Sequence, residues 1–68
     1  MTVDEFFATR RAELEAGVRR LLAARSPQTA TQLRVQLGAG MRELDRVLQQ
    51  LRKDGAIVSR RRWWELVP

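Results

Sequence analysis

The fold is decided by residues 37–57, which read LGAGMRELDRVLQQLRKDGAI. The segment Gly38-Ala39-Gly40 interrupts helical structure and predicts a short turn. A helix then runs from about Met41 to Asp54 and ends at Gly55. At 100° per residue, its apolar side chains gather on one face and its cations lie directly across the axis. The predicted core stripe is Met41, Leu44, Val47, Leu48 and Leu51, and the polar stripe is Arg42, Arg46, Gln49 and Lys53.

A long helix is predicted over residues 4–25, which contain one glycine and no proline. Thr2 suits the N-cap, and Asp4 and Glu5 fall in a first turn where the helix dipole favours acidic groups. The single glycine, Gly17, either marks a close helix crossing or is a tolerated imperfection. The apolar stripe of this helix consists of Val3, Phe7, Leu14, Val18 and Leu21.

A second, short helix is predicted over about residues 30–37. The preceding Ser26-Pro27 ends the first helix because proline lacks a backbone donor and disfavours helix in the residue before it. Thr29 and Gln32 have capping-box spacing, in which each side chain satisfies a backbone N–H of the other residue. The inward face of this helix is predicted to hold Ala30, Leu33 and Leu37.

Two short strands are predicted within about residues 56–67. The first is apolar and β-branched, the second alternates in polarity, and an arginine run separates them. The turn lacks glycine and asparagine, so its type and register stay open. Trp63 and Trp64 point to opposite faces of a strand. We expect Trp64 to join Leu66 and Ile57 in the core, and Trp63 to lie on the surface.

Three helices followed by a hairpin make the winged helix-turn-helix plan, which is mainly α with a short two-stranded wing. Residues 37–57 resemble the MarR-like pattern of winged-helix regulators, in which a Leu-Gly turn leads into a helix that ends in Leu-x-x-x-Gly. The matching positions are Leu37-Gly38, Leu44, Leu51 and Gly55. The resemblance covers about residues 14–67 of a single domain, 1–68. Two positions depart from the family: Arg34 replaces a small residue, and Gly40 replaces a Ser or Thr cap.

The resemblance implies that the helix over residues 41–54 enters the major groove of DNA. Arg42 and Arg46 suit guanine O6 and N7, and Gln49 suits adenine N6 and N7. Glu43 and Asp45 either accept hydrogen bonds from cytosine N4 or pair with the two arginines and weaken phosphate binding. The competing interpretation is a solvated, charged helix face without a ligand. The full set of expected contact positions is Gly40, Met41, Arg42, Glu43, Asp45, Arg46, Gln49 and Lys53.

Arg60, Arg61 and Arg62 fall where the tip of the wing belongs. Cations there would contact the phosphate backbone or enter an adjacent minor groove. The alternative is a solubilising turn that protects a strand edge. An exposed Trp63 would stack on a base or anchor a protein interface. Phe6 lies off the core stripe and is a candidate either for a dimer contact or for core filling.

The composition fits one small nucleic-acid-binding domain. The chain has 68 residues, of which 13 are basic and 8 acidic, for a net charge of +5. All of the bases except Lys53 are arginine, which binds phosphate and guanine in a bidentate manner, although codon usage in a GC-rich genome would give the same bias. Because cysteine and histidine are absent, disulfides, conventional metal sites and the commonest catalytic groups are excluded. We therefore expect no enzyme activity, no cofactor and no metal.

These features predict a sequence-specific double-stranded DNA-binding protein. We expect a small bacterial or phage transcription regulator, such as a repressor, that acts as a homodimer in the cytoplasm with the nucleoid. The acidic N-terminus and short apolar runs fit neither a signal peptide nor a membrane span. The alternative is a winged-helix protein-interaction adaptor. Residues 61–66, RRWWEL, resemble the closing strand of small winged-helix accessory proteins of bacterial ferrous-iron uptake, whose wing cysteines this chain lacks.

Overall fold

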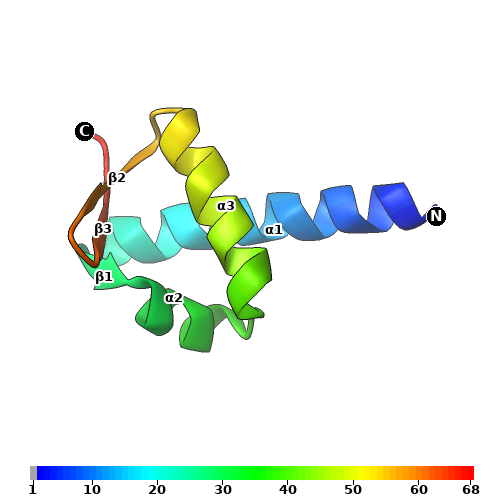
Figure 1. Cartoon of the computed structure of the whole chain (residues 1–68), viewed down its shortest axis with the longest axis horizontal. Helices are drawn as coiled ribbons and strands as arrows, with labels where there is room; N and C mark the ends of the chain where they lie inside the picture. Colours follow the sequence, from blue (N-terminus) through cyan, green and yellow to red (C-terminus); the bar gives the residue numbers. More distant parts are fainter. Residues whose placement is uncertain (1) are drawn as a thin grey trace.

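Three helices and three short strands are present in residues 2–68, the part of the chain that the computed structural model describes. Figure 1 shows α3 crossing α1, with the sheet beside one end of α1 and the N-terminal end of α1 projecting past the other elements. The predicted mainly helical fold with a small antiparallel sheet is confirmed; residue 1 of the predicted domain lies outside the described residues. The elements are α1 (Val3–Ala24), β1 (Gln28–Thr29), α2 (Ala30–Leu37), α3 (Met41–Lys53), β2 (Ile57–Arg60) and β3 (Trp63–Leu66).

The helices begin where their side-chain caps predict. The Thr2 hydroxyl accepts from the backbone N–H of Glu5 at 3.1 Å, and the Glu5 carboxylate accepts from the N–H of Thr2 at 3.2 Å. Thr29 and Gln32 form the same capping box at the start of α2, with distances of 3.2 and 2.9 Å. Gly38 ends α2 with a φ of 62°, which glycine adopts without steric cost. The predicted bounds of α2 are confirmed, and α1 and α3 each end one residue earlier than predicted.

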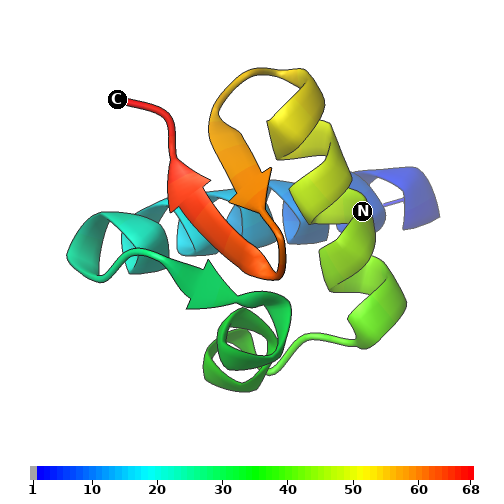
Figure 2. The same ribbon diagram turned by 60° about the vertical axis from the view of Figure 1, so that its left-hand side comes forward.

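The sheet has three antiparallel strands in the order β1-β3-β2, so the prediction of a two-stranded wing was incomplete. β1 pairs Thr29 with Trp63 and Gln28 with Trp64, which attaches the start of α2 to β3 (Figure 2). A strand of two residues is too short to show an alternating pattern, so β1 could not be predicted from periodicity.

The hairpin turn consists of Arg61 and Arg62. The strands on either side pair Arg60 with Trp63 and Ser59 with Trp64, which settles the register. Arg61 has a φ of 60°, a conformation that glycine or asparagine adopts more readily than arginine. The Ser59 hydroxyl donates to the Arg61 carbonyl at 3.3 Å and supports the turn.

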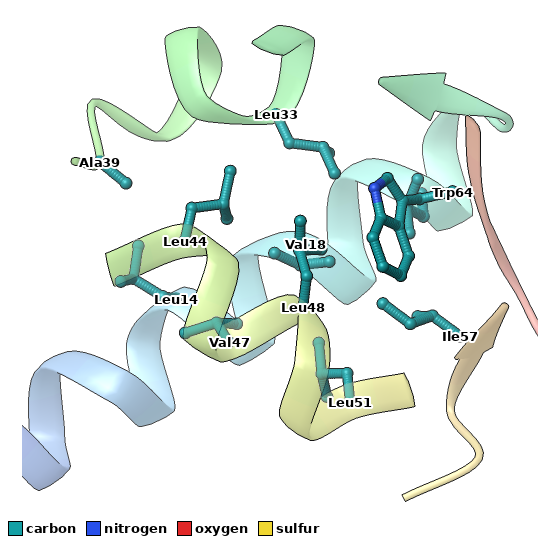
Figure 3. Close-up of a cluster of buried hydrophobic side chains, with 11 residues drawn as sticks. Leu14, Val18, Leu33, Ala39, Leu44, Val47, Leu48, Leu51, Ile57 and Trp64 are labelled. Carbon is teal, nitrogen blue, oxygen red and sulfur yellow. The ribbon is translucent and has the colours of Figure 1, made fainter. Parts of the chain in front are cut away.

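The core lies between the three helices and the inner face of the sheet (Figure 3). α3 contributes four buried residues, and Trp64 and Ile57 close the core from the hairpin as predicted. Leu22 is also buried, although it was not assigned to the predicted stripe. The buried cluster consists of Leu14, Val18, Leu22, Leu33, Ala39, Leu44, Val47, Leu48, Leu51, Ile57 and Trp64.

Four residues assigned to apolar core faces are exposed instead. Val3 and Phe7 are 70% and 58% exposed because α1 projects beyond the elements that cover its other end. Met41 is 66% exposed, and Ala30 is also exposed. Each of these two is the first residue of its helix, and helical side chains lean toward the N-terminus, away from the packed turns. Helical periodicity therefore predicted the apolar face correctly but not the length over which it is covered.

Gly17 lies where α1 meets α2. A Cβ atom added there would lie 2.6 Å from Cδ2 of Leu37, which is shorter than real contacts allow. The three nearest atoms all belong to the Leu37 side chain, so an added Cβ would meet the flexible end of a side chain of α2 rather than its backbone.

Candidate nucleic-acid interface

α3 divides its side chains between the core and solvent. Leu44, Val47, Leu48 and Leu51 are buried on one face. On the opposite face the side chains of Arg42, Arg46 and Lys53 are exposed, and Gln49 is half-buried. The four polar residues singled out from the sequence thus share one face of one rigid element. Its inner side is fixed by the core, so the orientation of the outer side is fixed as well.

The three cations of this face have no anionic partner among the residues that the structure describes. Among residues 2–68, the only salt bridge joins Arg10 of α1 to Glu43 of α3. Asp45 is exposed and does not pair with Arg42 or Arg46, which was one of the two alternatives for it. The guanidinium groups of Arg42 and Arg46 are therefore free to bind an external anion or a base edge.

Glu43 has a different environment from the other predicted contact residues. Its carboxylate accepts from Nε and Nη2 of Arg10, both at 3.2 Å, in a bidentate pair that connects α1 to the first turn of α3. The hydrogen bond from Arg10 is the main reason that the pKa of Glu43 is lowered, and the same bond raises the pKa of Arg10. Glu43 does not pair with Arg42 or Arg46, and both of its carboxylate oxygens are already engaged. Glu43 therefore helps to hold the first turn of α3 against α1.

Arg10 and Arg11 of α1 also contribute to this surface, although sequence reasoning did not select them. They line a cleft of about 510 Å³ at the corner where α1 emerges beneath α3. Arg11 additionally lines a neighbouring hollow of about 300 Å³ with Arg46, Gln49, Gln50 and Lys53. No sequence signal identified these residues, because their position depends on how α1 crosses α3. The cleft is lined by Phe7, Arg10, Arg11, Arg42, Glu43, Arg46 and Val47.

The other side of α3 faces α2 and is less basic. Met41 and Asp45, both predicted contact residues, line a small hollow of about 150 Å³ there together with Arg34. Arg34 is half-buried, and its Nε has no hydrogen-bond partner among the described residues. Gly40 caps α3 without a side-chain hydrogen bond, as expected for a residue without a polar side chain.

The hairpin turn presents a second basic surface. Arg60, Arg61 and Arg62 are exposed, and the Thr29–Trp63 pairing places the turn beside the start of α2. Trp63 is 44% exposed on the outer face of the sheet. In Figure 1, α3 lies between this hairpin and the projecting end of α1. Basic residues therefore lie on both sides of the polar face of α3.

Phe6 is at the projecting end of α1. Its side chain is 55% exposed, so core filling, one of the two alternatives for it, does not apply. Its ring meets that of Phe7 edge-to-face, with 5.6 Å between centroids. Together with Val3, these aromatic side chains form an exposed apolar end.

Comparison with protein-family models, curated proteins and solved structures finds no match to this chain. Within the described part of the chain, there is no group of three or more side chains suited to holding a metal ion. No helix between residues 2 and 68 combines the length and the apolar run needed to cross a bilayer.

Proposed function

We propose that this protein is a sequence-specific, non-enzymatic DNA-binding protein of the winged helix-turn-helix type. The observation that carries the proposal is the polar face of α3, on which three unpaired cations and a glutamine lie opposite a fully buried stripe. An amphipathic helix held in this way is what insertion into a major groove requires. The chain order of three helices followed by a hairpin is the plan that the resemblance of residues 37–57 implies.

Each side chain of this surface has a chemically suited target. Arg42 and Arg46 would donate to guanine O6 and N7, and Gln49 would bind adenine N6 and N7. Lys53 and the hairpin residues Arg60–Arg62 would contact phosphates, which fixes orientation without reading sequence. Such a protein would act in the cytoplasm, bound to the nucleoid, as a transcription regulator.

A band-shift assay tests the role of α3. Arg46→Ala is expected to abolish the specific band shift and to leave the thermal midpoint nearly unchanged, because Arg46 is exposed. Arg20→Ala makes the same charge change at an exposed position of α1 outside the lining of the described hollows, and should retain the specific band. Loss of the band in both variants would contradict a specific role for α3.

We further propose that the protein binds DNA as a homodimer through the projecting end of α1. A single small domain buries too little surface for tight specific binding, and a dimer would engage two half-sites. Phe6→Ala should shift the sedimentation of the protein from dimer to monomer. Val35→Ala, at another exposed apolar position in α2, should leave the dimer intact. A monomeric wild-type chain at high concentration would rule this arrangement out.

A protein-interaction adaptor is the second candidate function. Trp63 and Val58 favour it: both are exposed on the outer face of the sheet, diagonally across the β2–β3 pair, and an exposed tryptophan is typical of an interface anchor. The adaptor predicts that Trp63→Ala abolishes binding to a protein partner, and that wild-type protein shows no salt-dependent affinity for DNA.

A further inference from the structure

Arg11 is the one α1 side chain that lines both hollows beside the polar face of α3. It shares the larger cleft with Arg42 and Arg46, and the smaller one with Arg46 and Lys53. Like those cations, it is exposed and has no salt-bridge partner among residues 2–68. The basic surface is thus built from two helices rather than from α3 alone.

The charge of this cleft favours an anion. Its lining contains four arginines and a single glutamate, and that glutamate is already neutralised by Arg10. Phe7 and Val47 supply the apolar part of the lining. Arginine side chains converging on a hollow of this size suit a phosphate group, which a guanidinium binds in a bidentate manner.

We propose that Arg11 binds a phosphate of the DNA backbone on the side of α3 away from the hairpin. This inference rests on the proposed function, because it requires α3 to lie in the major groove. A helix in that groove has one DNA strand on either side. α3 lies between the hairpin and the projecting end of α1 (Figure 1), and Arg11 lines the cleft on the α1 side of α3, where the DNA strand farther from the hairpin would lie.

The same arrangement places the proposed DNA contact and the proposed dimer contact on different flanks of α1. Arg11 and Phe6 are five residues apart and therefore lie about 140° apart around α1. One flank of the projecting end faces the cleft, and the other carries the side chain proposed for the dimer contact. Phe7, which lines the cleft and contacts the Phe6 ring, lies between these two flanks.

The test is the salt dependence of DNA affinity, measured on a mixed-sequence duplex of about 20 base pairs. Each neutralised phosphate contributes about 0.9 to the slope of log affinity against log salt. Arg11→Ala should lower the magnitude of that slope by about this amount and weaken binding about five- to tenfold at 0.1 M salt. It should not change the preferred sequence. Arg11→Lys, which keeps the charge, should retain most of the slope.

Arg20→Ala is the matched control, because Arg20 is also exposed on α1 but lies about 180° around the helix from Arg11. If the salt dependence of DNA affinity is the same for Arg11→Ala, Arg20→Ala and the wild type, the inference is overturned. DNA binding by α3 would be unaffected by that result. Absence of salt-dependent DNA binding by the wild-type protein would instead overturn the proposed function, and this inference with it. Thermal melts of the variants establish that each is folded.

Discussion

At the scale of single residues, Gln28 is the polar side chain on which the packing depends most. It is only 4% exposed, and its amide donates to the carbonyls of Leu21 and Arg25 at 2.9 and 2.8 Å. Its side-chain oxygen accepts from Gln36 at 2.6 Å. The Leu21 carbonyl also accepts from the backbone N–H of Arg25, whereas the Arg25 carbonyl lies past the last turn of α1, where no helical N–H is available to donate. One buried side chain therefore connects the end of α1, β1 and α2.

Replacement of the Gln28 amide should lower the stability of the fold. Gln28→Met keeps the size of the side chain but removes the bonds to Leu21, Arg25 and Gln36 and leaves the Arg25 carbonyl without its donor, so we expect a loss of about 1–3 kcal/mol in the free energy of unfolding. Gln50→Met, at an exposed position of α3, should change stability by less than about 0.5 kcal/mol. Chemical denaturation of both variants checks this prediction, and equal effects would contradict the role assigned to Gln28.

The Arg10–Glu43 pair predicts a specific pH dependence. Because the folded state lowers the pKa of Glu43 below its ordinary value of 4.5, the stabilisation is present above that pH and is lost as pH falls through the lowered value. The wild-type melting temperature should therefore exceed that of Glu43→Gln near neutral pH. The difference should disappear in acid, once the wild-type carboxyl is protonated. A difference that persists unchanged to pH 2 would show that the ion pair is not its source.

At the scale of elements, α1 meets α2 at position 17, where the absence of a side chain leaves room for the Leu37 side chain. Gly17→Val would force a shift of Leu37 or of the helices and should destabilise the protein by about 1–3 kcal/mol. In a Leu37→Ala background the cost should be smaller, because the obstructing side chain has been removed. Ala16→Val, at an exposed position of the same helix, provides the control for β-branching alone. An equal loss of stability for Gly17→Val in both backgrounds would show that the effect does not come from contact with Leu37.

Local signals explain which elements could be predicted from the sequence. The N-cap at Thr2, the capping box at Thr29 and the glycine at 38 depend on neighbouring residues only, so they predicted these helix ends to within a residue. The two faces of α3 followed from periodicity, because both are defined within one helix. β1 and the exposure of Val3 depend on contacts between distant segments, and no local pattern reports those contacts.

At the scale of the whole molecule, the candidate interface combines parts that the sequence predicted with parts that it could not. Arg42, Arg46 and Lys53 followed from one helical face, and the exposed hairpin arginines followed from their position between two strands. Arg11 joins that surface only because α1 passes beneath α3 and projects beyond it. The chain thus presents basic residues on both sides of α3 and an apolar end on α1, an arrangement that fits a dimer on two DNA half-sites.

The most direct test of DNA reading by α3 is selection of bound sequences from a random DNA pool at near-physiological salt. It should be run with the wild-type protein and with the Arg42→Ala/Arg46→Ala double variant. We expect the wild type to enrich one palindromic motif, and the double variant to lose that motif while keeping its thermal midpoint. No enriched motif with the wild type, or the same motif with the double variant, would contradict the account.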